Sequence, residues 1–365
     1  MSYEDMSDEE ILANLAASSN QFSSHSKPIS DDFSTVKQRY SQGFIVNKGG
    51  MKLILKATDS ITNRPIAKAI LIDWDDAVKT ERFLKEARLT AALEHPNIIP
   101  VYDIGIDSAE GPFFTMKLVG GRSLTSILEE ISSSESDTDY SLRELMEIFL
   151  KICDAIAYAH SKGIIHLDLK PDNIQIDDYG EVLVCDWGLA KVMDQPEDID
   201  SFESNLDPDV YNDVTIDGYI KGTPNYMAPE QIKIDLSTKN QKTDIYALGG
   251  ILYTLLCLKA PHESTNVEDI LTETLTGKID LPSNRNEQNR IVPPSLEAVT
   301  LKAMARNAEN RYHSVPELSQ EIYKWMEGFA TDAEEAGFTD SRRRMTISKN
   351  HSLLSQFFQV RCGNF

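Results

Sequence analysis

The periodicity of the apolar residues changes once along this chain, at Gly120-Gly121. Before this point, apolar residues come in short runs with the composition of strands, and one stretch has helical spacing. A small, mostly antiparallel sheet that carries one helix accounts for both features. The predicted strands are Phe44–Val46, Lys52–Ala57, Pro65–Ile72, Ile98–Ile104 and Phe113–Leu118, and the predicted helix is Ala77–Leu93.

After the two glycines, the apolar spacing is helical. Leu142–His160 places six apolar residues on one stripe, as a helix that faces a core requires. The sequence therefore predicts an α+β chain with a sheet-rich lobe over residues 39–119 and a larger helical lobe over residues 120–328. Further helices are predicted at Thr243–Leu258, Val267–Leu275, Leu296–Ala305 and Val315–Met326.

Both ends of the chain differ from this central part. Residues 1–38 are polar and acidic and contain too little apolar surface to fold alone, so they are predicted to be a mobile arm. Residues 329–365 form a C-terminal tail that carries the basic run Arg342-Arg343-Arg344. Between Asp194 and Asp213 there are eight acids and no Lys or Arg, which predicts an exposed loop. That loop is either a solvated insertion or a site that selects basic substrates or docks the tail.

Composition excludes several classes of protein. The 58 acidic and 36 basic residues give a net charge of −22, which disfavours binding to nucleic acid or to an anionic membrane surface. The longest uncharged stretch, Ile245–Leu258, is shorter than the ~18 residues of a membrane span, so we expect no span in this chain. The four cysteines fit neither a metal motif nor a disulfide framework, and the acidic N-terminus does not resemble an export signal. These features predict a cytoplasmic location.

Three motifs follow one another in a fixed order in the predicted helical lobe. His166-Leu-Asp-Leu-Lys-Pro-Asp-Asn173 is followed by Asp186-Trp-Gly188 and then by Gly222-Thr-Pro-Asn-Tyr-Met-Ala-Pro-Glu230. This constellation resembles the eukaryotic-like protein kinase family, most closely its bacterial Ser/Thr kinases. The resemblance covers roughly residues 39–328. It implies the two-lobed protein kinase fold, a small antiparallel-sheet N-lobe with one helix and a larger helical C-lobe.

The resemblance also assigns roles to residues of these motifs. Asp168 would orient the substrate hydroxyl and accept its proton, and Lys170 would place a cation near the transferring phosphate. Asn173 and Asp186 would offer hard oxygen ligands to Mg²⁺, which bridges the phosphates of ATP. Lys170 together with Thr223 resembles Ser/Thr kinases rather than Tyr kinases. The implied partners are protein substrates with Ser or Thr acceptors, which the acidic loop would favour when they are basic, and the oligomeric state stays open.

ATP is expected between the two lobes. Met116 takes the gatekeeper position, the backbones of Lys117 and Val119 would bind the adenine edge, and Glu86 would orient a phosphate-binding lysine. Below the adenine, Gln175 replaces the apolar residue that is usual in the family, which would weaken adenine affinity. The other residues of the expected nucleotide site are Val46, Asn47, Gly49, Gly50, Lys52, Ile54 and Ala67.

The chain departs from the family at the phosphate-binding lysine. Ala69 occupies the third-strand lysine position, and Lys52 occupies the place of the third glycine in the glycine-rich loop. The with-no-lysine kinases have a similar arrangement, in which the lysine is relocated to that loop position. Three interpretations are open: Lys52 is a relocated phosphate clamp, the chain is a pseudokinase that has lost transfer, or a bulge returns Lys68 to the cleft. Alternation along a strand argues against Lys68, because neighbouring side chains point to opposite faces.

A second departure concerns regulation. Leu167 replaces the Arg that usually precedes the catalytic Asp and that pairs with a phosphorylated activation loop in many kinases. We therefore expect activity without loop phosphorylation. Two rivals to an active enzyme are considered, a pseudokinase that acts as a nucleotide-sensing binding module and a silent scaffold that recruits partners through its tails. Retention of Asp168, Asn173 and Asp186 favours a Mg·ATP-dependent Ser/Thr kinase.

Overall fold

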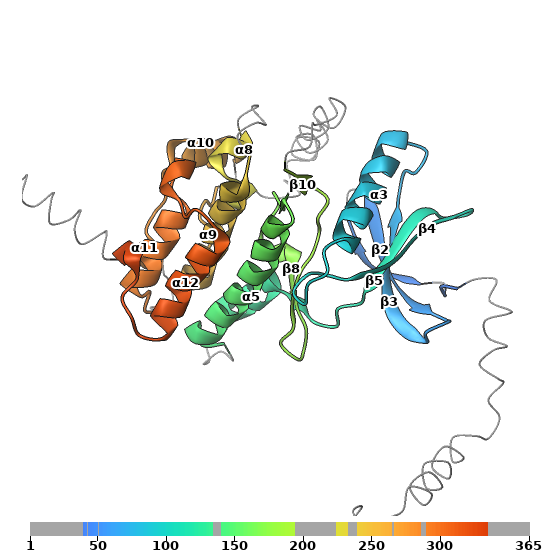
Figure 1. The fold of residues 1–365 in the computed structure, drawn as a ribbon, viewed down its shortest axis with the longest axis horizontal. Helices are drawn as coiled ribbons and strands as arrows, with labels where there is room; N and C mark the ends of the chain where they lie inside the picture. Colours follow the sequence, from blue (N-terminus) through green and yellow to red (C-terminus); the bar gives the residue numbers. More distant parts are fainter. Residues whose placement is uncertain are drawn as a thin grey trace, which may run out of the picture.

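The computed structural model describes residues 39–41, 43–49, 51–133, 140–193, 224–232, 239–264, 266–285 and 290–334. These residues form two lobes, one built around a sheet with a single helix and one built of helices (Figure 1). The predicted α+β organisation is therefore confirmed. The polar arm over residues 1–38, the acidic loop from Asp194 to Asp213 and the basic tail from residue 335 lie outside the described residues.

Five antiparallel strands make the sheet of the N-lobe, in the spatial order β1-β2-β3-β5-β4. All five predicted strands are present, with small changes at their ends. The predicted strand Ile98–Ile104 is wrong at its start, because Ile98 instead forms an isolated bridge with Val184 of the C-lobe. The strands are β1 (Phe44–Lys48), β2 (Lys52–Asp59), β3 (Arg64–Leu71), β4 (Val101–Asp107) and β5 (Gly111–Lys117).

The register between β2 and β3 decides which side chains share a face of this sheet. Ile54 lies opposite Ala69, and Leu55 lies opposite Lys68. Residues directly opposite each other point to the same face, and so do residues two apart along a strand. Lys52, Ile54 and Ala69 therefore share one face, and Lys68 lies on the other.

The single helix of the N-lobe, α3 (Ala77–Ala91), packs on the sheet. Asp76 caps its first turn by accepting hydrogen bonds from the backbone N–H groups of Val78 and Lys79. Phe83 is buried against Phe114 of β5, with 5.0 Å between the ring centroids. This packing fixes the rotation of α3 and so places Glu86, one turn further along, toward β2.

Helices form the C-lobe, and the longest, α5 (Leu142–Ser161), begins at a capping box between Ser141 and Glu144. Its apolar stripe is buried as predicted, against α9 and α12. The five helices predicted from periodicity are confirmed with ends shifted by a few residues at most. The other C-lobe helices among the described residues are α4 (Leu124–Ser133), α8 (Pro229–Ile232), α9 (Gln241–Cys257), α10 (Val267–Thr276), α11 (Pro294–Ala303) and α12 (Val315–Met326).

Short elements carry the loops between the lobes. Strands β6 (Arg122–Ser123), β8 (Ile174–Ile176) and β9 (Val182–Val184) form one small sheet, and β7 (Ile164–Ile165) pairs with β10 (Lys191–Val192). The chain segment that contains Asp168 thus lies between β7 and β8, and Asp186 lies two residues after the end of β9. Among the described residues of the lobe, 3₁₀ turns lie at Pro171–Asn173, Pro224–Tyr226, Pro282–Asn284 and Ala308–Asn310.

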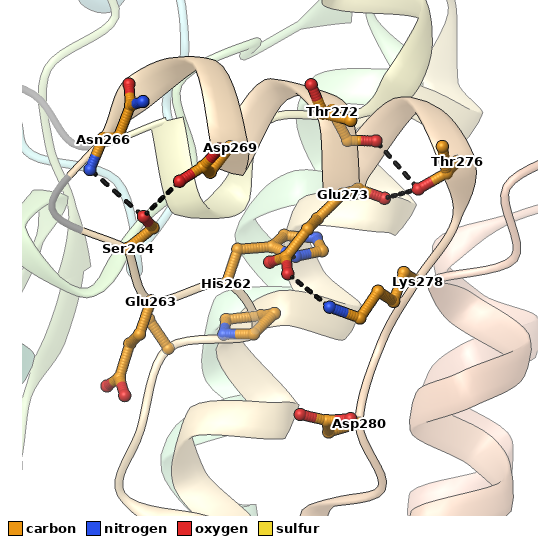
Figure 2. Close-up of polar contacts among 12 residues, drawn as sticks. His262, Glu263, Ser264, Asn266, Asp269, Thr272, Glu273, Thr276, Lys278 and Asp280 are labelled. Atoms are coloured by element: carbon orange, nitrogen blue, oxygen red, sulfur yellow. Dashed lines mark hydrogen bonds and ion pairs between the residues drawn. The ribbon is translucent and has the colours of Figure 1, made fainter.

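Polar contacts fix the approach to α10 (Figure 2). The Ser264 hydroxyl accepts a hydrogen bond from the Asn266 backbone and bonds to the Asp269 carboxylate, and Lys278 donates to Glu273 at the other end of the helix. At the end of the described chain, contacts with α12 continue past residue 328, because the Ala333 backbone donates to Glu321. Among the described residues, no helix combines the length and apolar character of a membrane span.

Candidate active site

Lys52 brings the two lobes into contact through its ammonium group. Its Nζ atom lies 2.5 Å from Oε1 of Glu86 on α3 and 3.1 Å from Oδ1 of Asp186, which follows β9. The Lys52 side chain is mostly buried, with 22% of its surface exposed. Three residues named from the sequence for the phosphate and metal site are thus in direct contact.

Opposite charges keep Lys52 and Asp186 ionised, whereas burial raises the pKa of Glu86. Burial alone lowers the pKa of Lys52, but the carboxylates of Glu86 and Asp186 outweigh it, so the pKa of Lys52 is raised and its ammonium stays charged. The positive charge of Lys52 is also the main reason why the pKa of Asp186 is lowered. Asp186 is therefore ionised, as a carboxylate that binds a metal cation must be.

Lys68 lies outside this group. Its ammonium is 2.5 Å from Oε2 of Glu110 and 4.6 Å from the centre of the Phe113 ring, on the other face of the sheet. The register of β3 with both β2 and β5 is continuous through Lys68, so the bulge that would return Lys68 to the cleft is wrong. Ala69 is fully buried on the cleft face, opposite Ile54.

The loop around Asp168 is held by its neighbours. Lys170 Nζ lies 2.9 Å from Oδ2 of Asp168, and Asn173 Nδ2 donates to the Asp168 backbone oxygen at 2.8 Å and to Oδ2 at 2.9 Å. The structure therefore brings Asp168, Lys170 and Asn173 together, as the motif implied. The nitrogen of the Asn173 amide faces Asp168, so its oxygen is the atom that can act as a metal ligand.

A buried carboxylate supports this loop from below. Asp244, in the first turn of α9, accepts hydrogen bonds from the backbone N–H groups of His166 and Leu167 at 2.8 and 2.9 Å, and from His160 Nε2 at 2.8 Å. These bonds help to hold Leu167 at φ 66°, a left-handed conformation that costs a non-glycine residue about 1 kcal/mol or more. In the sequence, Asp244 stands out only as an acidic residue that opens an otherwise apolar helix, and its contact with the Asp168 loop arises from packing.

Asn173 and Asp186 fit a magnesium ion. Both offer oxygen atoms, which Mg²⁺ prefers, and Asp186 is ionised. Within the described ranges, no group of three His, Cys, Asp or Glu residues is arranged to hold a metal by itself. In phosphoryl transfer, Mg²⁺ is usually held by one or two protein groups together with the phosphates.

The expected adenine site lies where β2, β3 and β5 meet the lobe connection. Ala67 lies opposite Met116 across the sheet. The backbone N–H of Lys117 donates to the Pro100 carbonyl at 3.1 Å, so this N–H is not available to bind a base. Gln175 lies on β8 and contacts the Asp172 carbonyl at 3.5 Å.

The remaining predicted residues divide between described and undescribed parts of the chain. Val46 is half exposed at the edge strand β1, Asn47 follows an irregularity in its pairing with β2, and Gly49 donates to the Lys52 carbonyl at 2.9 Å. Val119 lies in the connection after β5. Gly50 and Thr223 lie outside the described residues.

These features together give the architecture of a protein kinase. The chain has two lobes, an ion pair that joins the sheet to α3, a supported loop around Asp168 and two candidate metal ligands between the lobes. The protein kinase domain model matches residues 40–326, and the chain belongs to the protein kinase family. The family resemblance drawn from the motifs is thereby confirmed.

The relatives of this chain are also named as protein kinases. It is 36% identical over 340 residues to a serine/threonine-protein kinase PknD of Chlamydia trachomatis. This match covers 88% of this chain and 35% of the relative. It is 39% identical over 314 residues to a PknD of Protochlamydia amoebophila, with 82% of this chain and 30% of the relative covered. The chain thus spans about a third of the length of these relatives.

Proposed function

We propose that this chain is a Mg·ATP-dependent protein kinase that transfers the γ-phosphate to Ser or Thr hydroxyls, with Lys52 as its phosphate-binding lysine. The observation that carries the proposal is the contact of the Lys52 ammonium with both Glu86 and Asp186. The designation of the relatives as serine/threonine kinases supports the choice of acceptor.

The residues divide the work of the reaction. Asp168 accepts the proton of the acceptor hydroxyl, and Lys170, which is 2.9 Å from its carboxylate, faces the phosphate as it transfers. Lys52 binds the phosphates from the loop side, and Glu86 orients its ammonium. Asn173 and Asp186 hold the magnesium ion, which when bound neutralises charge on the phosphate oxygens.

Incubation of the purified chain with Mg²⁺, labelled ATP and a basic acceptor protein tests this function. Wild type is expected to label Ser or Thr, and Asp168→Asn and Asp186→Asn are expected to abolish labelling, because each removes a group that the reaction requires. Unchanged labelling by Asp186→Asn would overturn the metal-ligand assignment. Wild type that binds Mg·ATP without any transfer would identify a nucleotide-sensing pseudokinase instead.

We also propose that the protein acts in the cytoplasm. Cys153, Cys185 and Cys257 are free thiols, and Cys153 and Cys257 are buried. Free thiols persist in a reducing compartment. Cell fractionation with immunodetection of the chain tests this location, and recovery of the chain outside the cytoplasmic fraction would overturn it.

A further inference from the structure

Gln231 connects the short helix α8 to the peptide that carries Asp168. Its Nε2 atom donates to the Leu167 carbonyl at 2.8 Å, and its Oε1 atom accepts from the Ala228 backbone at 2.9 Å. Both ends of the amide are used, and the two partners fix which end is oxygen and which is nitrogen. The side chain is therefore a rigid link rather than a loose surface contact.

The Leu167 carbonyl belongs to the same peptide unit as the Asp168 N–H. That N–H donates to Nδ1 of His166 at 3.2 Å. His166 Nε2 lies 3.3 Å from the Cys185 carbonyl, an acceptor, so the buried imidazole carries its proton on Nε2 and uses Nδ1 as the acceptor. The peptide plane before Asp168 is thus held at its oxygen by Gln231 and at its nitrogen by His166.

This peptide needs support because the backbone around it is strained. Leu167 has φ 66°, and Asp244 holds only its N–H side. Loss of the bond to the carbonyl would let the peptide plane rotate, and rotation at this point swings the side chain of Asp168. A displacement of about 1 Å at a catalytic group can reduce the rate by ~10²-fold.

We propose that Gln231 is a positioning residue that sets the orientation of Asp168 through the Leu167 carbonyl. This inference rests on the proposed function, in which Asp168 takes the proton of the acceptor. Leu167 has no guanidinium that could bind a phosphorylated segment. The neutral amide of Gln231, on α8, supplies part of the support for the loop that contains Asp168. Both hydrogen bonds of the Gln231 amide are present in the described structure, and neither requires a phosphate group.

Gln231→Met tests the inference, because methionine keeps the length of the side chain but cannot donate a hydrogen bond. We expect kcat to fall roughly tenfold or more, with KM for ATP within about twofold, since Gln231 lies away from the expected nucleotide site. Gln241→Met is the matched control. Gln241 also donates to a distant backbone carbonyl, that of His160 at 3.2 Å, and its loss should leave kcat unchanged.

Hydrogen exchange of the peptide that contains Leu167 and Asp168 gives a readout independent of activity. Exchange there should be about tenfold faster in Gln231→Met than in wild type and unchanged in Gln241→Met. Should Gln231→Met fail to fold, Gln231→Glu retains the acceptor for Ala228, removes the donor and turns a carboxylate oxygen toward the Leu167 carbonyl. Wild-type kcat and wild-type exchange in the Gln231 variants would overturn the inference. An inactive wild type would overturn the proposed function instead, and the exchange result would still decide the role of Gln231.

Discussion

Lys68 illustrates at the scale of a single residue how one position along a strand changes the use of a lysine. Its stem is buried on the outer face of the sheet, where its ammonium pairs with Glu110 and lies over Phe113. A charge in such a place contributes to stability through these partners, and loss of it leaves Glu110 without this ion pair.

The first prediction separates the stability role of Lys68 from catalysis. Lys68→Met should reduce the free energy of unfolding by about 1–2 kcal/mol, because it removes the ion pair and the ring contact but keeps the apolar stem. Urea denaturation measures this loss. The specific activity of the folded variant should equal that of wild type, and a variant of normal stability without activity would contradict this assignment.

The helices and strands show which parts of the fold can be predicted from the sequence. Periodicity predicted the five-stranded sheet and the long helices, because each buries a regular face. It missed α4 and the strands β6 to β10. These strands are only two or three residues long, too short to show a period. The position of Lys52 near Glu86 was expected from the resemblance to the with-no-lysine kinases, and alternation along the third strand argued only against Lys68. The exclusion of Lys68 required the register of β2 with β3, which depends on the packed sheet.

The second prediction exchanges the lysine between two strands. Lys52→Gly with Ala69→Lys should recover about tenfold activity over Lys52→Gly alone, because both positions lie on the cleft face of the sheet. Steady-state transfer to a basic peptide measures the recovery. Ala69→Lys alone serves as the control for steric damage, and equal activity of the single Lys52→Gly and double variants would show that the two positions do not serve one phosphate site.

The third prediction concerns the catalytic loop as a unit. Asp244 and Gln231 hold this loop without any phosphate group, and Leu167 offers no partner for one. Phosphatase treatment should therefore leave turnover within about twofold of the untreated protein. A large loss of activity that returns on incubation with ATP would disprove this independence.

At the scale of the whole molecule, the Glu230–Arg311 pair joins distant parts of the C-lobe. The Arg311 guanidinium is fully buried and donates to Oε1 of Glu230 at 2.6 Å and to Oε2 at 2.9 Å, and it also bonds to the Lys242 carbonyl. Burial raises the pKa of Glu230, but the hydrogen bonds and charge of Arg311 outweigh it, so the net pKa lies below its ordinary 4.5. The pair therefore stabilises the C-lobe while Glu230 is ionised.

The fourth prediction follows from the sign of this shift. A carboxyl whose folded pKa is lowered contributes stability above its unfolded value, and that contribution is lost as the pH falls through the folded pKa. Glu230→Gln should cost about 3 kcal/mol at pH 7, where it leaves the buried Arg311 charge unpaired, and less under acid conditions. Denaturation curves at pH 7 and at about pH 3.5 measure the difference. The same loss at both pH values would show that the charge of Glu230 is not responsible.

The relocated lysine is the central claim, and phosphoryl transfer by Lys52→Ala and Lys68→Ala tests it most directly. The two variants should be compared at saturating Mg·ATP, with melting temperature as the check on folding. The account predicts a loss of roughly 10²-fold or more in Lys52→Ala, the size expected for one transition-state charge donor, and little change in turnover for Lys68→Ala. Full activity in Lys52→Ala together with an inactive Lys68→Ala would contradict it.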